Sequence, residues 1–248
     1  MRWVKRVNLP SSAITYLRQR QKKANAKLVS GNLDTDSEWN SARKTKSMGK
    51  VLTALVQMAG KRQRCMYCLD SHGSDIEHFR PKAKDAYPKR MFRWRNLLLC
   101  CSKCGTLKGN QFPLQGKRPL LIDPSKEEPW RYLDYDSVLG IIIPRFDPQA
   151  NAPSSKGVKT VEILKLDQRE SLEEGHKKTC RRLKKTVQKL LSNPNMPMAE
   201  FIEELQDADE QELLGWCFIG TGQDETPFKE FKQKHPSLWQ YCARALGY

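Results

Sequence analysis

The chain has 248 residues, with 44 Lys and Arg against 28 Asp and Glu, a formal net charge of +16 and 38% hydrophobic residues. That apolar content is enough for a folded core, whereas the longest apolar run, Leu97 to Cys101, is far shorter than the ~20 residues that cross a bilayer. The basic residues near Met1 are followed by no apolar run of the secretory-signal kind, so we expect a cytoplasmic protein with no membrane partner.

The first 64 residues predict a basic, helical N-terminal segment. Residues 1–33 contain no acid, and a helix can begin at Pro10 and continue through Leu17. For the basic stretch from there to Lys27, a mobile segment is the alternative to a helix. From Asp34 to Arg64 the pattern is helical, with apolar residues three or four positions apart: Met48, Leu52, Leu55, Val56 and Ala59.

Two Cys-x-x-Cys pairs indicate a metal site. Cys65 and Cys68 form the first pair, and Cys101 and Cys104 form the second. Four thiolates from two such turns are the tetrahedral set that structural Zn²⁺ prefers, whereas four unliganded thiols are the alternative. Cys100 could replace Cys101, but only Cys101 gives the two-residue gap.

Between the pairs lie two strand-like runs and an acid next to a histidine. The runs are residues 75–79, which include Glu77 and His78, and residues 96–100. A carboxylate beside an imidazole can bind a divalent metal and activate water. We interpret His72, His176 and His235 as structural residues.

Cations cluster again between residues 80 and 118, against Asp85 as the one acid. Clustered cations indicate a polyanion partner, most often nucleic acid, whereas a solvated surface or an acidic protein partner is the alternative.

The second half of the chain predicts strands and then helices. Residues 119–165 read as short strands and turns, with a hairpin joining residues 132–136 to residues 141–144. A helix starts at Leu172 and ends before Asn193, and further helices cover 198–218 and 227–246, the last interrupted at Pro236. We expect the cysteines on the apolar stripes of these helices to be core residues: Cys180, Cys217 and Cys242.

The order of the motifs resembles that of HNH, or ββα-metal, nucleases, and most closely the PtuB family of Septu and certain retron-type anti-phage systems. The resemblance runs from Arg64 to about Arg169. It is carried by Arg64-Cys-Met-Tyr-Cys68, Asp75-Ile-Glu-His-Phe-Arg-Pro-Lys82, Trp94-Arg-Asn-Leu-Leu-Leu-Cys100, Lys108-Gly109, Phe112-Pro-Leu114 and Leu121-Ile-Asp-Pro124.

The resemblance implies an α+β fold, in which a small zinc-stapled ββα-metal core is embedded in a mainly α-helical protein. With it, the chain divides into a basic N-terminal segment (1–64), a four-cysteine nuclease core (65–125), a region of short strands (126–170) and a C-terminal helical region (171–248).

The family's roles transfer residue by residue. His78 resembles the general base, Glu77 the acidic ligand of a catalytic Mg²⁺ or Mn²⁺, and Asn96 the middle residue that holds the active loop by hydrogen bonds to its backbone. Candidates for binding phosphate are Arg80, Lys82 and Lys108.

One position departs from the family pattern. Many HNH proteins place a second metal ligand directly after the second cysteine pair, where this chain has Gly105. Water, Asn110 or the more distant Asp123 could take that coordination place, although we favour a turn role for Asp123. The glycine could also mark an inactive nuclease.

The resemblance further implies that the protein works in a complex. The expected partners are a nucleic-acid substrate and a PtuA-like ABC-type ATPase, with a retron RNA–DNA element as a further option. DNA is the first expectation for the substrate, and RNA, including tRNA, is the alternative. Neither Gly60-Lys61 nor Gly116-Lys117 continues into a phosphate-binding loop, and the candidate docking surfaces are residues 34–62 and 172–248. Competing interpretations are a non-catalytic zinc-containing nucleic-acid adaptor and a protein-interaction subunit.

Overall fold

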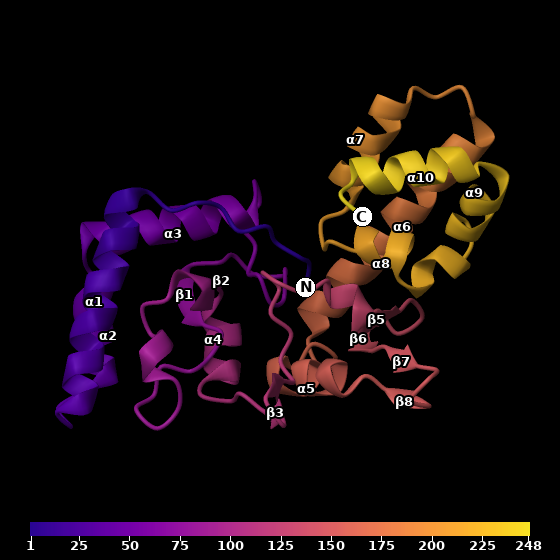
Figure 1. Cartoon of the computed structure of the whole chain (residues 1–248). Coiled ribbons are helices and arrows are strands. Elements are labelled where there is room, and N and C mark those ends of the chain that lie inside the picture. The colour runs from indigo at the N-terminus through magenta and orange to yellow at the C-terminus, as the bar shows by residue number, and fades with distance from the viewer. The chain divides into compact units, whose positions relative to one another are not determined.

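The computed structural model describes all 248 residues and divides into two compact units (Figure 1). The N-terminal unit contains Met1 and Trp3–Glu127, and the C-terminal unit contains Arg2 and Glu128–Tyr248. Both units contain more helix than strand, and the strands form four separate two-stranded antiparallel sheets. The expectation of a mainly helical α+β protein is therefore confirmed at this level. The finer division of the chain into four regions stays a prediction.

The N-terminal unit combines four α-helices with two short hairpins. Its elements are α1 (Ser11–Val29), α2 (Thr35–Arg43), α3 (Lys46–Ala59), β1 (Asp75–His78), the 3₁₀ turns η1 (Pro88–Arg90) and η2 (Trp94–Asn96), β2 (Leu97–Cys100), α4 (Ser102–Lys108), β3 (Leu114–Gln115) and β4 (Arg118–Pro119).

Two details of these helices differ from the expectation. α1 continues to Val29, so the basic stretch to Lys27 is helical. The single helix expected from Asp34 to Arg64 is two helices, because two side chains cap two separate helix starts. Asp34 accepts hydrogen bonds from the backbone N–H groups of Asp36 and Ser37, and Thr45 accepts one from Met48.

The predicted strands around the acid and histidine are confirmed. β1 and β2 pair antiparallel, with Glu77 opposite Leu98 and His78 opposite Leu97. β2 is buried along its whole length because α3 packs against it. α4 starts directly after β2, where the Cys101 sulfur accepts a hydrogen bond from the Cys104 N–H and so caps the helix.

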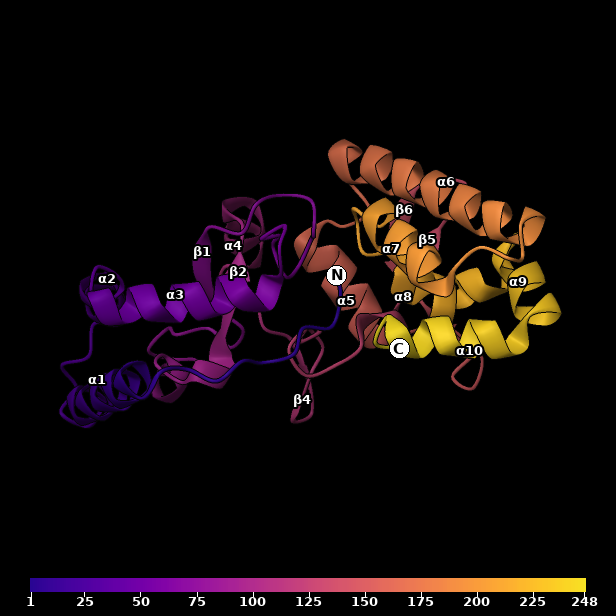
Figure 2. The ribbon, with the colours of Figure 1, turned by 90° about the horizontal axis from the view of Figure 1, so that it is seen from above.

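The C-terminal unit combines two hairpins with six helices. Its elements are η3 (Pro129–Arg131), β5 (Leu133–Asp136), β6 (Ile141–Pro144), β7 (Phe146–Asp147), β8 (Ala152–Pro153), α5 (Ser155–Leu164), α6 (Glu170–Ser192), α7 (Met198–Ala208), α8 (Leu214–Ile219), η4 (Thr221–Asp224), α9 (Phe228–Lys234) and α10 (Pro236–Ala245). In Figure 2, α6 and α10 lie along opposite sides of this unit. The hairpin of β5 and β6 and the start of α10 at Pro236 agree with the sequence.

Two expectations in this unit are wrong. Helix α5 lies where only strands and turns were expected, and its β-branched residues explain why the local pattern favoured strands. The helix expected over 198–218 is interrupted, because the Asp209 carboxylate accepts hydrogen bonds from the N–H groups of Leu213 and Leu214 and starts α8 there.

The core of the C-terminal unit is aromatic. The rings of Tyr135 and Trp216 meet edge to face with centroids 5.0 Å apart, and the Trp216 indole donates a hydrogen bond to Asp134. His176 is buried beside Tyr135, and burial lowers its pKa to about 3, which keeps it neutral as a structural residue. The three cysteines expected in the core are buried: Cys180, Cys217 and Cys242. Across the whole chain, every helix is too short or too polar to cross a bilayer.

Candidate functional site

Four cysteine sulfurs meet at one end of the hairpin. Cys65, Cys68, Cys101 and Cys104 are all buried, and their sulfurs lie within 4.8 Å of one another. The sulfurs of Cys68 and Cys101 are 3.8 Å apart. A tetrahedral ion with metal–sulfur bonds of about 2.3 Å requires sulfur–sulfur distances of about 3.8 Å. The cluster could therefore bind zinc, as the two Cys-x-x-Cys pairs predicted.

Cys100 borders this cluster without belonging to it. Its sulfur lies 3.9 Å from that of Cys65, and its thiol donates a hydrogen bond to the carbonyl of Cys101. Hydrogen bonds with Cys100 and the other thiols lower the pKa of Cys101 and raise that of Cys104. These shifts favour a thiolate at Cys101 and a thiol at Cys104. A divalent ion would instead favour thiolates at both positions.

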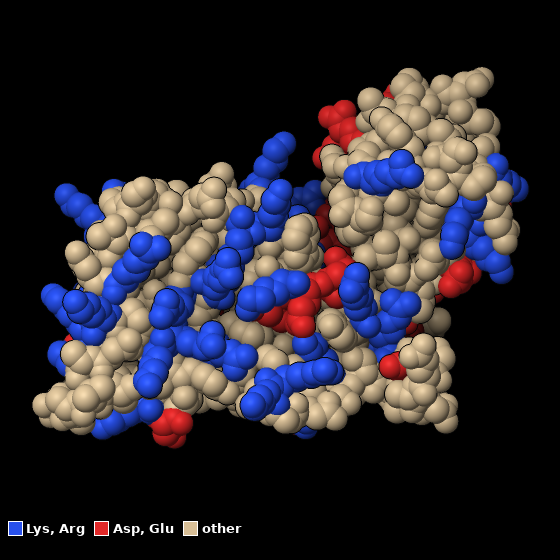
Figure 3. Space-filling model, in the orientation of Figure 1, with Lys and Arg blue, Asp and Glu red and all other residues tan.

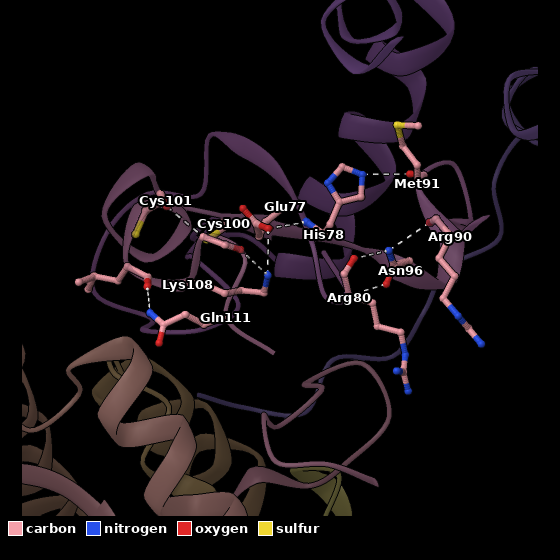
Figure 4. A network of polar contacts seen from close by, with 12 residues as sticks. Glu77, His78, Arg80, Arg90, Met91, Asn96, Cys100, Cys101, Lys108 and Gln111 are labelled. Atoms are coloured by element: carbon pink, nitrogen blue, oxygen red, sulfur yellow. Dashed lines mark hydrogen bonds and ion pairs between the residues drawn. The ribbon is translucent and has the colours of Figure 1, made fainter. Parts of the chain in front are cut away.

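A cavity of about 500 Å³ opens beside the cluster. β1, α2, α3 and α4 all contribute to its wall. Of the residues predicted for catalysis and phosphate binding, four line it: Glu77, His78, Lys82 and Asn110. Gly105 and the predicted zinc ligand Cys101 line it as well, whereas Arg80, Asn96 and Lys108 lie outside its lining. Figure 4 shows five of these residues around β1: Glu77, His78, Arg80, Asn96 and Lys108.

Glu77, in the cavity lining, forms an ion pair with the buried Lys108. The Glu77 carboxylate accepts a hydrogen bond from the His78 backbone N–H at 2.8 Å and faces the Lys108 ammonium at 3.3 Å. The Lys108 side chain has no exposed surface, and that of Glu77 is 21% exposed. Burial raises the pKa of Glu77 and lowers that of Lys108, and each partner opposes the shift of the other.

His78 is held in one tautomer. Its Nε2 lies 3.0 Å from the carbonyl oxygen of Met91, and a carbonyl can only accept a hydrogen bond. Nε2 therefore carries the proton, and Nδ1 keeps the lone pair. The Trp39 ring packs edge-on against the imidazole at 4.3 Å. Burial lowers the pKa of His78 to about 3, so the ring is neutral at physiological pH.

Asn96 ties together the two segments that surround His78. Its side-chain oxygen accepts a hydrogen bond from the Arg80 N–H at 2.8 Å, and its amide donates to the carbonyls of Arg80 and Arg90. Gln21 of α1 fixes the same segment from the other side, because it bonds the carbonyl of Pro88 and the N–H of Phe92. The Met91 carbonyl that orients His78 is therefore anchored on both sides.

The three cations that the sequence predicts to bind phosphate have different surroundings. The Arg80 guanidinium lies 4.9 Å from the Tyr87 ring centroid and 4.8 Å from that of Phe112, and it points away from Glu77 (Figure 4). Lys82 lines the cavity and forms an ion pair with Asp36. Lys108 is buried against Glu77.

Gly105 lies next to the Glu77 carboxylate. A Cβ at position 105 would lie 3.3 Å from Oε2 of Glu77, so a side chain there would reach the same space. Asn110 is exposed on the cavity wall. Asp123 does not line the cavity, and its carboxylate accepts hydrogen bonds from Ser125 in the turn that follows.

Sequence reasoning missed the residues that orient the site. No sequence pattern marks the Met91 carbonyl, because every residue has a backbone carbonyl. Trp39 and Gln21 reach the site only through tertiary packing. The burial of Lys108 did have a signal. It follows Cys104 by four residues in α4, and residues with that spacing share one helix face.

The first prediction separates Cys100 from the metal cluster. Cys101→Ser should lose about one zinc per chain, because it removes one of four thiolate ligands. Cys100→Ser is the matched control and should keep its zinc. Elemental analysis of the purified proteins measures both. Full zinc content in Cys101→Ser, or equal loss in Cys100→Ser, would contradict the assignment.

The second prediction concerns the buried ion pair. Lys108→Met should destabilise the protein by about 3 kcal/mol, the low end for breaking a buried pair, because Glu77 keeps some contact with water. Adding Glu77→Gln should recover most of the loss, since no charge is then left unpaired. Lys103→Met, at an exposed position of the same helix, is the control.

Urea unfolding measures all four proteins. An equal loss for Lys108→Met with and without Glu77→Gln would show that the charge pairing contributes nothing.

Comparison with known proteins identifies one relative. The chain is 30% identical over 148 residues to the Septu protein PtuB of Bacillus thuringiensis, which corresponds to 58% of this chain and 52% of that protein. The chain thus spans about half the length of this curated relative. No protein-family model and no solved structure matches the chain. The similarity supports the resemblance to PtuB that the motifs between Arg64 and Arg169 carry.

Proposed function

We propose that the chain is a metal-dependent endonuclease of the HNH type, which hydrolyses phosphodiester bonds as the effector of an anti-phage system. One observation carries the proposal. Glu77 and a neutral His78 are neighbours on β1 and line the same cavity, directly beside the four-cysteine cluster. The succession of β1, β2 and α4 also corresponds to the two strands and helix of a ββα-metal motif.

His78 would act as the general base. Its Nδ1 keeps a lone pair because Nε2 donates to Met91, so Nδ1 can accept a proton from water that attacks the phosphorus. The Asn96 hydrogen bonds hold the loop after β1 and keep the imidazole oriented. Lys82, on the cavity wall, would bind a phosphate oxygen.

The residues around Glu77 fit a hydrated Mg²⁺ or Mn²⁺. Mg²⁺ commonly uses one or two carboxylates and completes its shell with water and substrate phosphate. Glu77 supplies the carboxylate, Asn110 is the candidate for a second oxygen ligand, and Gly105 leaves space for water beside Oε2. When bound, the ion would neutralise charge on the phosphate and on the leaving oxygen.

The test compares two histidines of the same unit. His78→Gln should reduce cleavage at least ~10²-fold, the usual loss on removing a general base, and should retain zinc and helicity. His72→Gln, at an exposed position, should cut like the wild type. Plasmid DNA, single-stranded DNA and structured RNA, each with Mg²⁺ or Mn²⁺, are the substrates. Undiminished cutting by His78→Gln would eliminate His78 as the base.

A second candidate function is a non-catalytic nucleic-acid adaptor. Two observations favour it: Gly105 provides no ligand, and the Lys108 ammonium already neutralises Glu77. An adaptor would bind nucleic acid equally well as wild type and as His78→Gln, and neither protein would cut any of the substrates.

We further propose that the chain works with a PtuA-like ABC-type ATPase, and that a retron RNA–DNA element is an additional partner. The similarity to the Septu protein PtuB supports this partnership. A nuclease that is free in its host would damage the host's own nucleic acid, so a restraining partner is expected. The docking surfaces proposed are residues 34–62 and 172–248.

Co-expression with the ATPases encoded beside this chain tests the partnership. A tagged chain should retain one of them through size-exclusion chromatography, and ATP should change the cleavage rate of the complex. An isolated chain that binds none of them and cuts at its full rate would refute this proposal.

A further inference from the structure

A large groove in the N-terminal unit lies outside the candidate nuclease site. It has a volume of about 1330 Å³ and runs between α1 and residues 84–95. Its lining contains seven cations and no carboxylate: Arg18, Lys22, Lys84, Lys89, Arg90, Arg93 and Arg95. Figure 3 shows Lys and Arg side chains spread over this unit.

The cations of the groove are exposed and form no ion pairs. Other cations of the unit do pair with acids, as Arg20 and Lys27 do with Glu38 and Lys82 does with Asp36. None of the seven has such a partner, although Lys84 donates a hydrogen bond to the Gly31 carbonyl. Seven like charges around one groove repel one another, so the groove is complementary to an extended polyanion.

Apolar side chains lie between these cations. Ile14 and Leu28 of α1 and the rings of Tyr87 and Trp94 line the groove and are partly exposed. Arg6 lies 4.9 Å from the Trp94 ring centroid, and Arg80 lies 4.9 Å from that of Tyr87, so each ring also has a cation beside it. A groove whose lining combines cations with aromatic rings is typical of sites that hold unpaired bases and their phosphates. A duplex hides its bases and would leave the apolar surface uncovered.

We propose that this groove binds single-stranded nucleic acid, with the seven cations on the phosphates and the apolar surface against unpaired bases. The proposal deepens the proposed function, because it names the form of the substrate and where a strand is held. Binding itself needs no cleavage and can be tested separately.

The groove and the candidate site share one segment. Lys89, Arg90 and Arg93 flank Met91, whose carbonyl orients His78. Gln21, which lines the groove, fixes that segment through Pro88 and Phe92. A nucleic-acid strand bound along the groove would therefore contact the same backbone segment that orients His78, the proposed general base.

The test measures binding by fluorescence anisotropy over a range of salt concentrations. The probes are labelled 20-nucleotide single strands of DNA and of RNA and a 20-base-pair duplex, with no Mg²⁺ or Mn²⁺ added and probe integrity checked on a gel. The groove variant is Arg18→Gln with Lys22→Gln. The matched control is Lys23→Gln with Lys46→Gln, which removes the same charge from exposed positions outside the groove.

We expect the single strands to bind at least tenfold more tightly than the duplex. The groove variant loses two cations, and each phosphate contact with a single strand contributes about 0.7 to the slope of log affinity against log salt. The magnitude of that slope should therefore fall by about 1.4 in the variant. The control should keep the wild-type slope. Equal effects of the two variants, tighter binding of the duplex, or no binding at all would overturn the proposal.

Two further outcomes separate this proposal from neighbouring ones. Displacement of the strand by polyglutamate as readily as by unlabelled oligonucleotide would indicate an acidic protein partner and overturn it. If the wild type binds the single strands but cleaves no substrate, the nuclease proposal is wrong and the groove proposal is unaffected. If the groove variant binds the single strands like the wild type and still cleaves, the groove proposal is wrong and the nuclease proposal is unaffected.

Discussion

A hairpin of two four-residue strands is too small to hold its shape alone in water, and the organisation of the N-terminal unit follows from this constraint. The structure fixes the hairpin at both ends. At one end, the four thiols join the turn after α3 to the start of α4. At the other, Asn96 bonds the backbone of the loop that leaves β1. Helix α3 covers the buried strand between them.

Because the hairpin is fixed, the ionisable side chains of β1 stay in surroundings that disfavour their charged forms. Glu77 and His78 are adjacent at the end of β1, and both line one cavity. The carboxylate faces a fully buried lysine, and the imidazole packs against a tryptophan. Both groups lose hydration, which raises the pKa of the acid and lowers that of the base. Perturbed groups of this kind are common where chemistry occurs, although structural ion pairs share the feature.

The cations of the unit fall into distinct groups with separate consequences. Lys108 is internal and balances Glu77, so its charge serves the fold. Arg20, Lys27 and Lys82 pair with acids of α2 and tie it to its surroundings. The seven cations that line the groove between α1 and residues 84–95 form no ion pairs, so their mutual repulsion is unrelieved within the protein. A net charge of +16 therefore says little about a binding surface until the paired cations are set aside.

Local sequence determined a large part of this protein. The spacing of two Cys-x-x-Cys pairs selected the four cysteines that the fold brings together, because a two-residue gap is itself a short-range geometric constraint. The hairpin of β1 and β2, the long helix α6 and the break at Pro236 also followed from local patterns. Interruptions at Thr45 and Asp209 did not, since a polar side chain accepts hydrogen bonds from the backbone of the next helix only when the chain turns there.

Only the tertiary structure decided the surroundings of the site. The sequence offered Lys108 as a candidate for binding phosphate, but the packing of α4 places it against Glu77, with no exposed surface. It gave no hint of the Met91 carbonyl or of Gln21, because backbone groups and a single amide carry no pattern. The sequence by itself thus determined which residue types are present and which neighbours share a strand or helix face. Burial and partners, which set the charge and tautomer of Glu77 and His78, depend on segments distant in the chain, so only the folded structure could decide them.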